Sequence, residues 1–550
     1  MEEGERQRSD MAAYLKLFTG NSIFRLMLLG EVVNNLGSWL NYIATLTLVE
    51  RLDKSKLHLS FVLLVRFLPY FFWAPVAGIV ADRRRRDWTM VITCAAPALV
   101  VSCLALIHRA QDLWVLYVLL FIQFSLGAFY DPARRALMPQ VVPPEQLHLA
   151  TTMDSWSWSL MSAFGASIGG FVASRLGSSA AYLLDALSYV LAALFALAIV
   201  GRVPGPGEPP LWRQSQKLFH KSSDTLESPA AEALHSKLPF IELLPVKSRM
   251  SDAMVTQVNL AVADEDSPHD SSIPAAESSA GQVAALQTER TGAVAAVGGW
   301  GVVLEGFREE LGAMREGWAY MTFPGNRGIA ALALLKGTSA CVWMAADVLN
   351  VLYAAMPRMQ TLGNEQLTLG FIFAGVGVGC FCGPIMFNWI TTPEVVPMLR
   401  TCVWAFALMC TAWLGLIVAT NIWVVIISTA VRSLGSATVY VYSTLMLQVQ
   451  VPNALQGRVF AIEMAFSTVA QIAAGIFPGI AMDDLHLSVQ STAACVTVNA
   501  AVMFVFWLLV YMCYFKRGAD KKGSYELLDQ QELGGLSANE LLEKRPFQQD

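Results

Sequence analysis

Long apolar runs, separated by short polar segments, dominate the chain. A helix that crosses a bilayer needs about 20 mostly apolar residues. Backbone exposed to lipid must satisfy its own hydrogen bonds, which favours helices at such runs. The pattern therefore predicts twelve membrane-spanning helices, at residues 23–49, 58–81, 88–107, 112–130, 151–173, 178–200, 329–355, 367–390, 397–419, 421–443, 459–481 and 489–515.

The runs fall into two sets of six, separated by a long polar gap. We therefore expect an all-α membrane protein with six-helix halves at residues 23–201 and 329–515. A short repeat supports this division. Residues 137–147 and 445–455 follow the fourth run of each half and share Leu, Met, Gln, Val, Pro and Leu in register. Duplicated halves with a site at their interface are a known transporter design.

The polar segments outside the runs divide into tails, a linker and one amphipathic stretch. Residues 1–22 and 516–550 are predicted tails, and residues 202–302, rich in Ser, Glu, Pro and Ala, are a predicted disordered linker. In residues 303–328 apolar side chains recur at helical spacing, which predicts an amphipathic helix on the membrane surface. A helix that binds a partner protein is the alternative. The apolar stripe comprises Val303, Phe307, Leu311, Met314 and Trp318.

The composition agrees with a membrane protein and argues against several other classes of protein. Hydrophobic residues make up 55% of the chain and charged residues 15%, against about 25% charged residues in soluble domains. The net charge of −5 predicts no binding of nucleic acid. The nine cysteines form no paired metal-binding pattern, and we find neither a phosphate-cradling glycine loop nor a nucleophile–base motif. We therefore expect no metal, no cofactor and no enzymatic activity.

Lys and Arg residues in the short loops predict an orientation. They are more numerous on the side of the N-terminal tail, which includes residues 83–86 and 134–135, than on the side that holds Arg51, Lys54 and Arg358. Short cytoplasmic loops carry the excess of positive charge. We therefore expect both termini and the linker in the cytoplasm.

The loop after the second run reads Gly-Ile-Val-Ala-Asp-Arg-Arg-Arg-Arg, from Gly78 to Arg86. Four arginines by themselves indicate only an anchor on the cytoplasmic side. The Gly-x-x-x-Asp-Arg spacing at this point resembles the loop 2–3 signature of the major facilitator superfamily. That resemblance implies that Asp82 and Arg83 latch the two halves together and control their rocking. Arg85 stands where the family usually has a glycine.

The fifth run contains Gly165-Ala-Ser-Ile-Gly169-Gly170, which resembles the antiporter signature Gly-Pro-x-x-Gly-Gly with Ala166 in place of proline. A plain small-residue packing motif is the alternative. Further stretches strengthen the resemblance: Arg66 to Pro69 in the second run, 129–137 after the fourth and 448–460 after the tenth. Together they resemble the branch that includes enterobactin and macrolide exporters. This implies an exporter driven by proton exchange, with a substrate cavity between the halves.

Polar residues inside the first run form one helical face. Charged groups in a membrane helix cost free energy and are functional candidates. Glu31 is therefore a candidate carrier of the coupling proton, and its alternative role is to anchor the helix near the headgroups. Trp39, next to this face, is a candidate for stacking on a flat substrate. The face comprises Glu31, Asn34, Asn35, Ser38, Asn41 and Tyr42.

Further charges lie inside other runs. Lys336 and Asp347 are eleven residues apart, about three helical turns. They are too far apart to pair with each other, so we expect each to have a partner in another helix. The remaining candidates for the substrate and proton cavity are Arg66, Asp185 and Arg432. The alternative role of Asp185 is structural hydrogen bonding. The alternative role of Arg66 is to connect the second predicted helix to the eleventh.

Two acidic residues are expected outside the cavity. We expect Asp131 to pair with the Arg83–Arg86 cluster and to join the latch. Glu463 is expected at the start of the eleventh helix, where a carboxylate suits the helix N-terminus.

The leading functional hypothesis is a proton-coupled exporter of a small organic molecule, embedded in the lipid bilayer. An importer of the same fold is the first alternative, and a non-transporting receptor or scaffold is the second. One fold serves many substrates, so the residues do not predict the cargo.

Overall fold

The computed structural model describes residues 12–205, 208–213, 308, 312, 314–323, 326–392 and 394–516. Nearly all of the predicted linker and of the predicted C-terminal tail lie outside these residues. The side chains of Pro75, Ile79, Asp82, Arg83, Asn453, Ala454 and residues 514–516 also lie outside the description.

Six long helices form the N-terminal helix group: α2 (Ser22–Leu52), α3 (Lys56–Arg83), α4 (Arg86–Leu104), α5 (Leu113–Val141), α6 (Leu147–Leu176) and α7 (Ser178–Ile199). The Asn21 side chain starts α2, because its oxygen accepts a hydrogen bond from the Phe24 backbone N–H at 3.0 Å. Residues 12–20, predicted as part of a tail, are helical as well. Leu17 in that segment is buried.

The C-terminal helix group comprises α13 (Arg327–Trp343), α14 (Ala345–Ala355), α15 (Glu365–Asn388), α16 (Val395–Ile417), α17 (Ile422–Gln450), α18 (Asn453–Asp483) and α19 (Val489–Val510). The run at 329–355, predicted as one helix, is divided between α13 and α14. Side chains from neighbouring helices satisfy carbonyls at this break. Trp413 Nε1 donates to Val342 O at 3.1 Å, and Arg432 Nη1 donates to Trp343 O at 3.2 Å.

Every predicted run coincides with helix, but several helices are longer than predicted. Helix α5 continues to Val141, whereas the apolar run ends near residue 130. The polar residue Arg134 ends the apolar run in the sequence, yet it is buried in the protein at 3% exposure. The helix can therefore continue past the run.

Within the described ranges, ten helical segments are long and apolar enough to cross a membrane, with α13 and α14 counted as one. Helices α2 and α6 do not meet this criterion, because α2 carries amide, hydroxyl and carboxyl side chains and α6 carries many hydroxyl side chains. No strand occurs among the described elements. The described part is therefore all-helical, and its composition is that of a multi-pass membrane protein.

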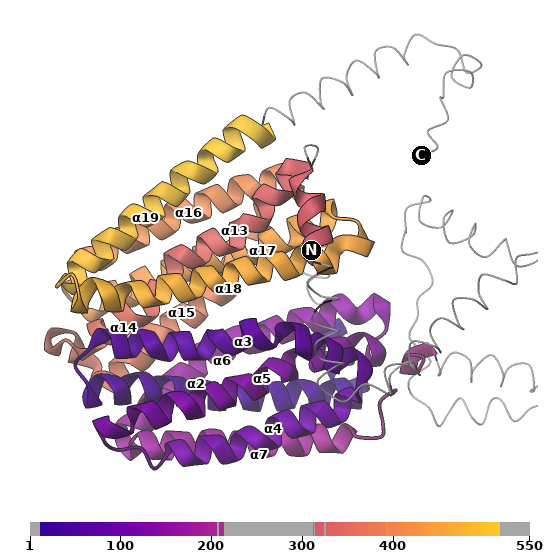
Figure 1. Cartoon of the computed structure of the whole chain (residues 1–550), viewed down its shortest axis with the longest axis horizontal. Coiled ribbons are helices and arrows are strands. Elements are labelled where there is room, and N and C mark those ends of the chain that lie inside the picture. Colours follow the sequence, from indigo (N-terminus) through magenta and orange to yellow (C-terminus); the bar gives the residue numbers. More distant parts are fainter. Residues whose placement is uncertain are drawn as a thin grey trace, which may run out of the picture. The chain divides into compact units, whose positions relative to one another are not determined.

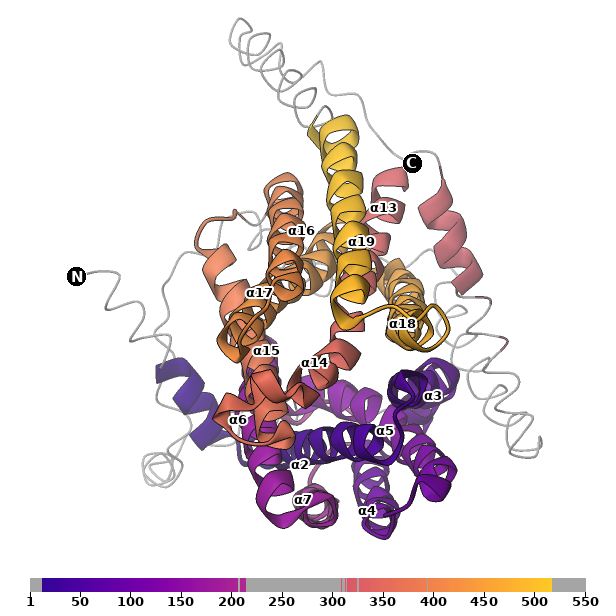
Figure 2. The ribbon, with the colours of Figure 1, turned by 90° about the vertical axis from the view of Figure 1, so that its left-hand side faces the viewer.

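The two groups meet along two helix pairs, α6 with α15 and α3 with α18. Figure 1 shows α3 and α18 side by side, and Figure 2 shows the same neighbours from an end of the helices. Glycines allow the α6–α15 contact. A methyl group at Gly170 would lie 3.0 Å from the Gly370 Cα, whereas one at Gly169 would lie 3.0 Å from the Leu40 Cα of α2. These two glycines therefore serve close packing against different helices.

Part of the predicted amphipathic stretch is described, and residues 314–322 are helical. Gly317 and Met321 are buried, whereas Trp318 of the predicted stripe is 59% exposed. Val303, Phe307 and Leu311 lie outside the described residues, so a membrane-surface helix over 303–328 stays a prediction.

Candidate functional site

A side-chain hydrogen bond joins the two helix groups. Tyr42 Oη of α2 donates to Asp347 Oδ2 of α14 at 2.6 Å. The Arg66 guanidinium of α3 lies 4.3 Å from the centre of the Tyr42 ring and 5.0 Å from that of Phe124. We call Tyr42, Arg66, Asp347 and Arg432 the central cluster.

Aromatic rings from both groups surround Tyr42. The Trp39 and Phe373 rings lie 5.7 Å and 5.4 Å from it, and they lie 5.8 Å from each other. Trp39 is thus packed between the groups, at the edge of the central cluster. The contacts of Arg66 lie within its own helix group, on α2 and α5, and differ from the expected alternative of a tie to α18.

Arg432 enters the central cluster from α17. It is 1% exposed and donates to Trp343 O at the break between α13 and α14. Asp347 lies within electrostatic reach of both Arg432 and Arg66. The cluster therefore combines one carboxylate with two guanidinium groups, and the partner of Asp347 in another helix is Tyr42.

Asp185 belongs to a separate network inside the N-terminal group. Its carboxylate accepts from Asn41 Nδ2 at 2.8 Å and from Ser188 Oγ at 3.2 Å. Asn41 Nδ2 also donates to Gln123 Oε1 at 3.3 Å. All four side chains are buried. These contacts tie α2, α5 and α7 together, and they match the structural alternative for Asp185.

A buried ion cluster links α2, α5 and α6 elsewhere in the same group. Arg134 Nε lies 3.3 Å from Glu31 Oε2, and the same guanidinium pairs with Asp154. Asn35 Nδ2 donates to Glu31 Oε1 at 2.9 Å. Glu31 is 8% exposed, so it lies inside the protein and not among lipid headgroups. Asp131 lies 3.9 Å from Arg134 Nη2. Its expected pairing with the Arg83–Arg86 cluster stays a prediction, because the Arg83 side chain lies outside the description.

Sequence reasoning missed Arg134 and Asp154 as members of this cluster. Arg134 was interpreted as a loop residue because it follows the apolar run, although it lies inside α5. The available signal was Asp154, a carboxylate within the predicted fifth helix that requires a partner.

The C-terminal group holds its own buried ion pair. Lys336 Nζ of α13 donates to Glu463 Oε2 of α18 at 3.0 Å and to Thr444 Oγ1 of α17 at 3.1 Å. The ammonium also lies 4.3 Å from the centre of the Tyr440 ring. The expectation for Glu463 was wrong, because α18 begins at Asn453 and the carboxylate lies well inside the helix, fully buried.

The expected polar face of α2 divides among these sites. Glu31 and Asn35 join the ion cluster, Asn41 faces Asp185, and Tyr42 faces Asp347. Ser38 is half-buried. Asn34 Oδ1 is buried without a hydrogen-bond partner among the described atoms. The face therefore connects α2 to several helices and does not line one continuous surface.

The predicted gating loop is described in part. Arg86 Nε donates to Ala81 O at 2.8 Å, and Arg86 Nη1 donates to Ala136 O at 3.1 Å. These bonds fix the loop to the end of α5. The side chains of Asp82 and Arg83 lie outside the description, so their role as a latch stays a prediction.

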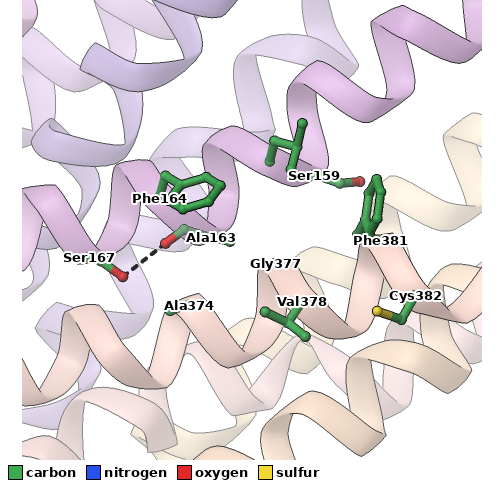
Figure 3. A pocket seen from close by; sticks show the side chains of 10 residues that line it. Ser159, Ala163, Phe164, Ser167, Ala374, Gly377, Val378, Phe381 and Cys382 are labelled. Atoms are coloured by element: carbon green, nitrogen blue, oxygen red, sulfur yellow. Dashed lines mark hydrogen bonds between the residues drawn. The ribbon is translucent and has the colours of Figure 1, made fainter.

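A groove of about 260 Å³ follows the contact between α6 and α15. Figure 3 shows its lining, in which Ser167 donates to Ala163 O of its own helix. Its residues are apolar or small and carry no charge, so the groove is distinct from the central cluster. They are Ser159, Leu160, Ala163, Phe164, Ser167, Ala374, Gly377, Val378, Phe381 and Cys382.

Solved structures resemble the fold of this chain. An auto-inhibited peptide transporter of the POT family matches with a TM-score of 0.57 at 16% identity, over 90% of this chain and 97% of that one. A nucleoside transporter matches with a TM-score of 0.53 at 9% identity, over 88% of this chain and 98% of that one. At these identities the likeness concerns the fold.

Curated relatives match over a shorter length. An uncharacterised MFS-type transporter of Bacillus subtilis is 28% identical over 32% of this chain and 42% of its own length. Macrolide efflux protein A of Enterococcus faecalis is 30% identical over 26% of this chain and 45% of its own. The staphyloferrin A transporter of Staphylococcus aureus is 22% identical over 30% and 42%. The chain thus spans less than half the length of the relatives it matches.

The family comparison covers the N-terminal helix group and continues into the predicted linker. Residues 27–255 match the sequence model of the Major Facilitator Superfamily. The match contains α2 to α7, the gating-loop motif and the glycines of α6. The family match and the curated relatives confirm the predicted resemblance: the N-terminal part of this chain is similar to the Major Facilitator Superfamily and to macrolide efflux proteins.

Proposed function

We propose that this protein is a secondary transporter that exports small organic molecules in exchange for protons. In this proposal its twelve helices form two six-helix halves that rock about a central site. The hydrogen bond between Tyr42 and Asp347 supports the proposal most directly, because it places a titratable group at a contact between the halves.

Protonation of Asp347 would change this contact. An ionised carboxylate accepts a charge-assisted hydrogen bond, which is roughly twice as strong as a neutral one. A proton on Asp347 would therefore weaken its tie to Tyr42 and leave Arg66 and Arg432 less neutralised. Both effects change the stability of the arrangement in which α2 and α14 are close, relative to the one in which they are apart. Coupling of protonation to the conformational change requires such a difference.

The proposed direction rests on the relatives. The gating-loop spacing and the glycines of α6, which carry the resemblance in the sequence, lie within the part that matches the family. Macrolide efflux protein A gives export as the first hypothesis. An importer would use the same central cluster, and the direction of the pH gradient that drives flux distinguishes the two.

The test is gradient-driven flux in proteoliposomes with a macrolide and a siderophore as alternative cargoes. In the wild type we expect cargo to move in the direction opposite to proton flow. In Asp347→Asn we expect this cargo flux to fall at least tenfold. The matched control is Asp112→Asn, which removes the same charge at a short helical turn between α4 and α5. Cargo exchange without a gradient should persist in Asp347→Asn, because only the proton-carrying group is removed.

Two results would overturn this proposal. Undiminished gradient-driven flux in Asp347→Asn would remove Asp347 as the coupling group. Cargo flux in the same direction as proton flow would replace export by import.

A further inference from the structure

Helices α3 and α18 end in the same short pattern. Helix α3 ends in Gly78-Ile-Val-Ala-Asp82 before Arg83, and α18 ends in Gly479-Ile-Ala-Met-Asp483. The two helices belong to different groups and lie side by side (Figure 1). They are antiparallel, because the start of α3 contacts the end of α18. The two patterns therefore lie at opposite ends of one helix pair.

At the Asp483 end the helices are joined by hydrogen bonds. Asp483 Oδ2 accepts from Ser55 Oγ at 2.6 Å and from the Leu57 backbone N–H at 2.8 Å. Ser55 is the residue before α3, and Leu57 lies in its first turn. Ser55 makes no capping bond within its own helix. The carboxylate of α18 therefore caps the start of α3 and interacts favourably with its dipole.

Gly479 makes this contact possible. Its backbone N–H donates to Ser60 Oγ at 3.2 Å. A methyl group at Gly479 would lie 2.7 Å from Ser60 Oγ and 2.8 Å from the Leu57 Cα. Contact with a backbone atom at that distance cannot be relieved by rotating a side chain. The glycine thus permits a close approach that no other residue would allow.

The Asp82 end differs in the corresponding position. A methyl group at Gly78 would meet no described atom within 4 Å. The same is true at Gly457, near the start of α18. The pair of helices is therefore tightly packed at the Gly479 position, whereas no described atom limits the approach of another helix at the Gly78 position. A single rigid packing of two helices with matched patterns gives no reason for this difference.

We propose that Asp483 is a gating residue, and that the α3–α18 pair carries two gates of the same Gly-x-x-x-Asp design that close alternately. The hydrogen bonds of Asp483 hold its gate closed in the structure, whereas no described atom lies within 4 Å of a methyl group at Gly78. The charge pattern of the loops predicts that the Asp483 gate lies on the side of the membrane away from the cytoplasm. The inference rests on the proposed alternating access, since two gates have a purpose only where the halves rock.

The test measures the distance between the helix ends in the purified full-length protein by electron paramagnetic resonance. Spin labels at Lys54→Cys and Leu485→Cys report the Asp483 end, and labels at Arg84→Cys and Gly457→Cys report the other end. All four positions are exposed. The nine native cysteines are replaced by serine, and no cargo or gradient is required.

Asp483→Asn is expected to raise the ratio of open to closed populations at the Asp483 end roughly tenfold, because hydrogen bonds to a charged group are lost. The distances at the other end should shorten at the same time. Asp484→Asn is the matched control, because Asp484 is exposed and next in sequence. It should leave both distance distributions unchanged.

Two glycine variants give a second test that removes no charge. Gly479→Ala should open the Asp483 end, whereas Gly78→Ala should prevent closure of the opposite end and keep the Asp483 end closed. Wild-type distances in both Asp483→Asn and Gly479→Ala would overturn the proposal, as would opening of both ends together. Opposite shifts in a protein without proton-driven flux would support the gates and reject the proposed coupling.

Discussion

Removing one partner of the buried Lys336–Glu463 ion pair is expected to destabilise the C-terminal helix group by about 3–5 kcal/mol. The two side chains are 4% and 0% exposed, and their charged atoms lie 3.0 Å apart. A single substitution leaves the other charge buried without compensation. The pair connects α13 to α18, so the loss should affect the packing of the whole group.

The two single variants should differ in magnitude. In Glu463→Gln, Lys336 keeps its bond to Thr444 and its contact with the Tyr440 ring, which is worth about 0.5–2 kcal/mol. We expect a value near the lower limit. In Lys336→Met, the Glu463 carboxylate loses its ammonium, and its Oε1 already lacks a hydrogen-bond partner among the described atoms. We expect a value near the upper limit.

The assay is denaturant unfolding in mixed micelles, arranged as a double-mutant cycle. The double variant Lys336→Met/Glu463→Leu removes both charges and should recover most of the stability, because apolar replacement of a buried pair is often neutral. The matched control is the exposed pair of Glu316 and Arg458, at 63% and 39% side-chain exposure. Its removal should cost less than about 1 kcal/mol. A double variant as unstable as the sum of the single variants would refute the reasoning.

Three further predictions concern the N-terminal group and its contacts. Arg134→Met should lower the unfolding free energy by about 3–5 kcal/mol, because the buried Glu31 carboxylate and the partly buried Asp154 carboxylate lose their counter-charge; the exposed neighbour Arg135→Met, measured in the same micelles, should differ little from wild type. Gly170→Val should separate α6 from α15, since even a methyl group would lie 2.5 Å from a carbonyl oxygen of α15; the yield of a disulfide between cysteines introduced on these two helices should fall. Tyr42→Phe keeps the ring beneath Arg66 and removes the bond to Asp347; gradient-driven flux should decrease while cargo exchange persists, and unchanged flux would separate Tyr42 from coupling.

The helices were predictable from the sequence because most of them contain a long, mainly apolar stretch. The positions of Arg66, Asp347 and Arg432 inside apolar runs also marked them as candidates. Their partners were not predictable, since Tyr42 and Asp347 are 305 positions apart in sequence. Helical spacing places residues on one face, but it does not tell which neighbouring helix that face meets.

The predicted helix boundaries were wrong for a related reason. Glu463 and Arg134 were assigned to helix ends because hydropathy decreases where charged residues occur. Each is instead paired inside the protein, within α18 and α5 respectively. A charged residue of a buried ion pair lowers the local hydropathy just as a loop residue does, because its partner lies elsewhere in the sequence.

The two helices that fall below the hydropathy criterion, α2 and α6, both contact several other helices. Helix α2 provides Glu31 to the ion cluster, Asn41 to Asp185 and Tyr42 to Asp347. Helix α6 provides Asp154 to the ion cluster and Gly170 to the contact with α15. The polar side chains named here contact other parts of the protein, so low hydropathy in these helices indicates internal contacts and not a loop. In a bundle of this kind, the least apolar helices are therefore the first place to look for the groups that couple the halves.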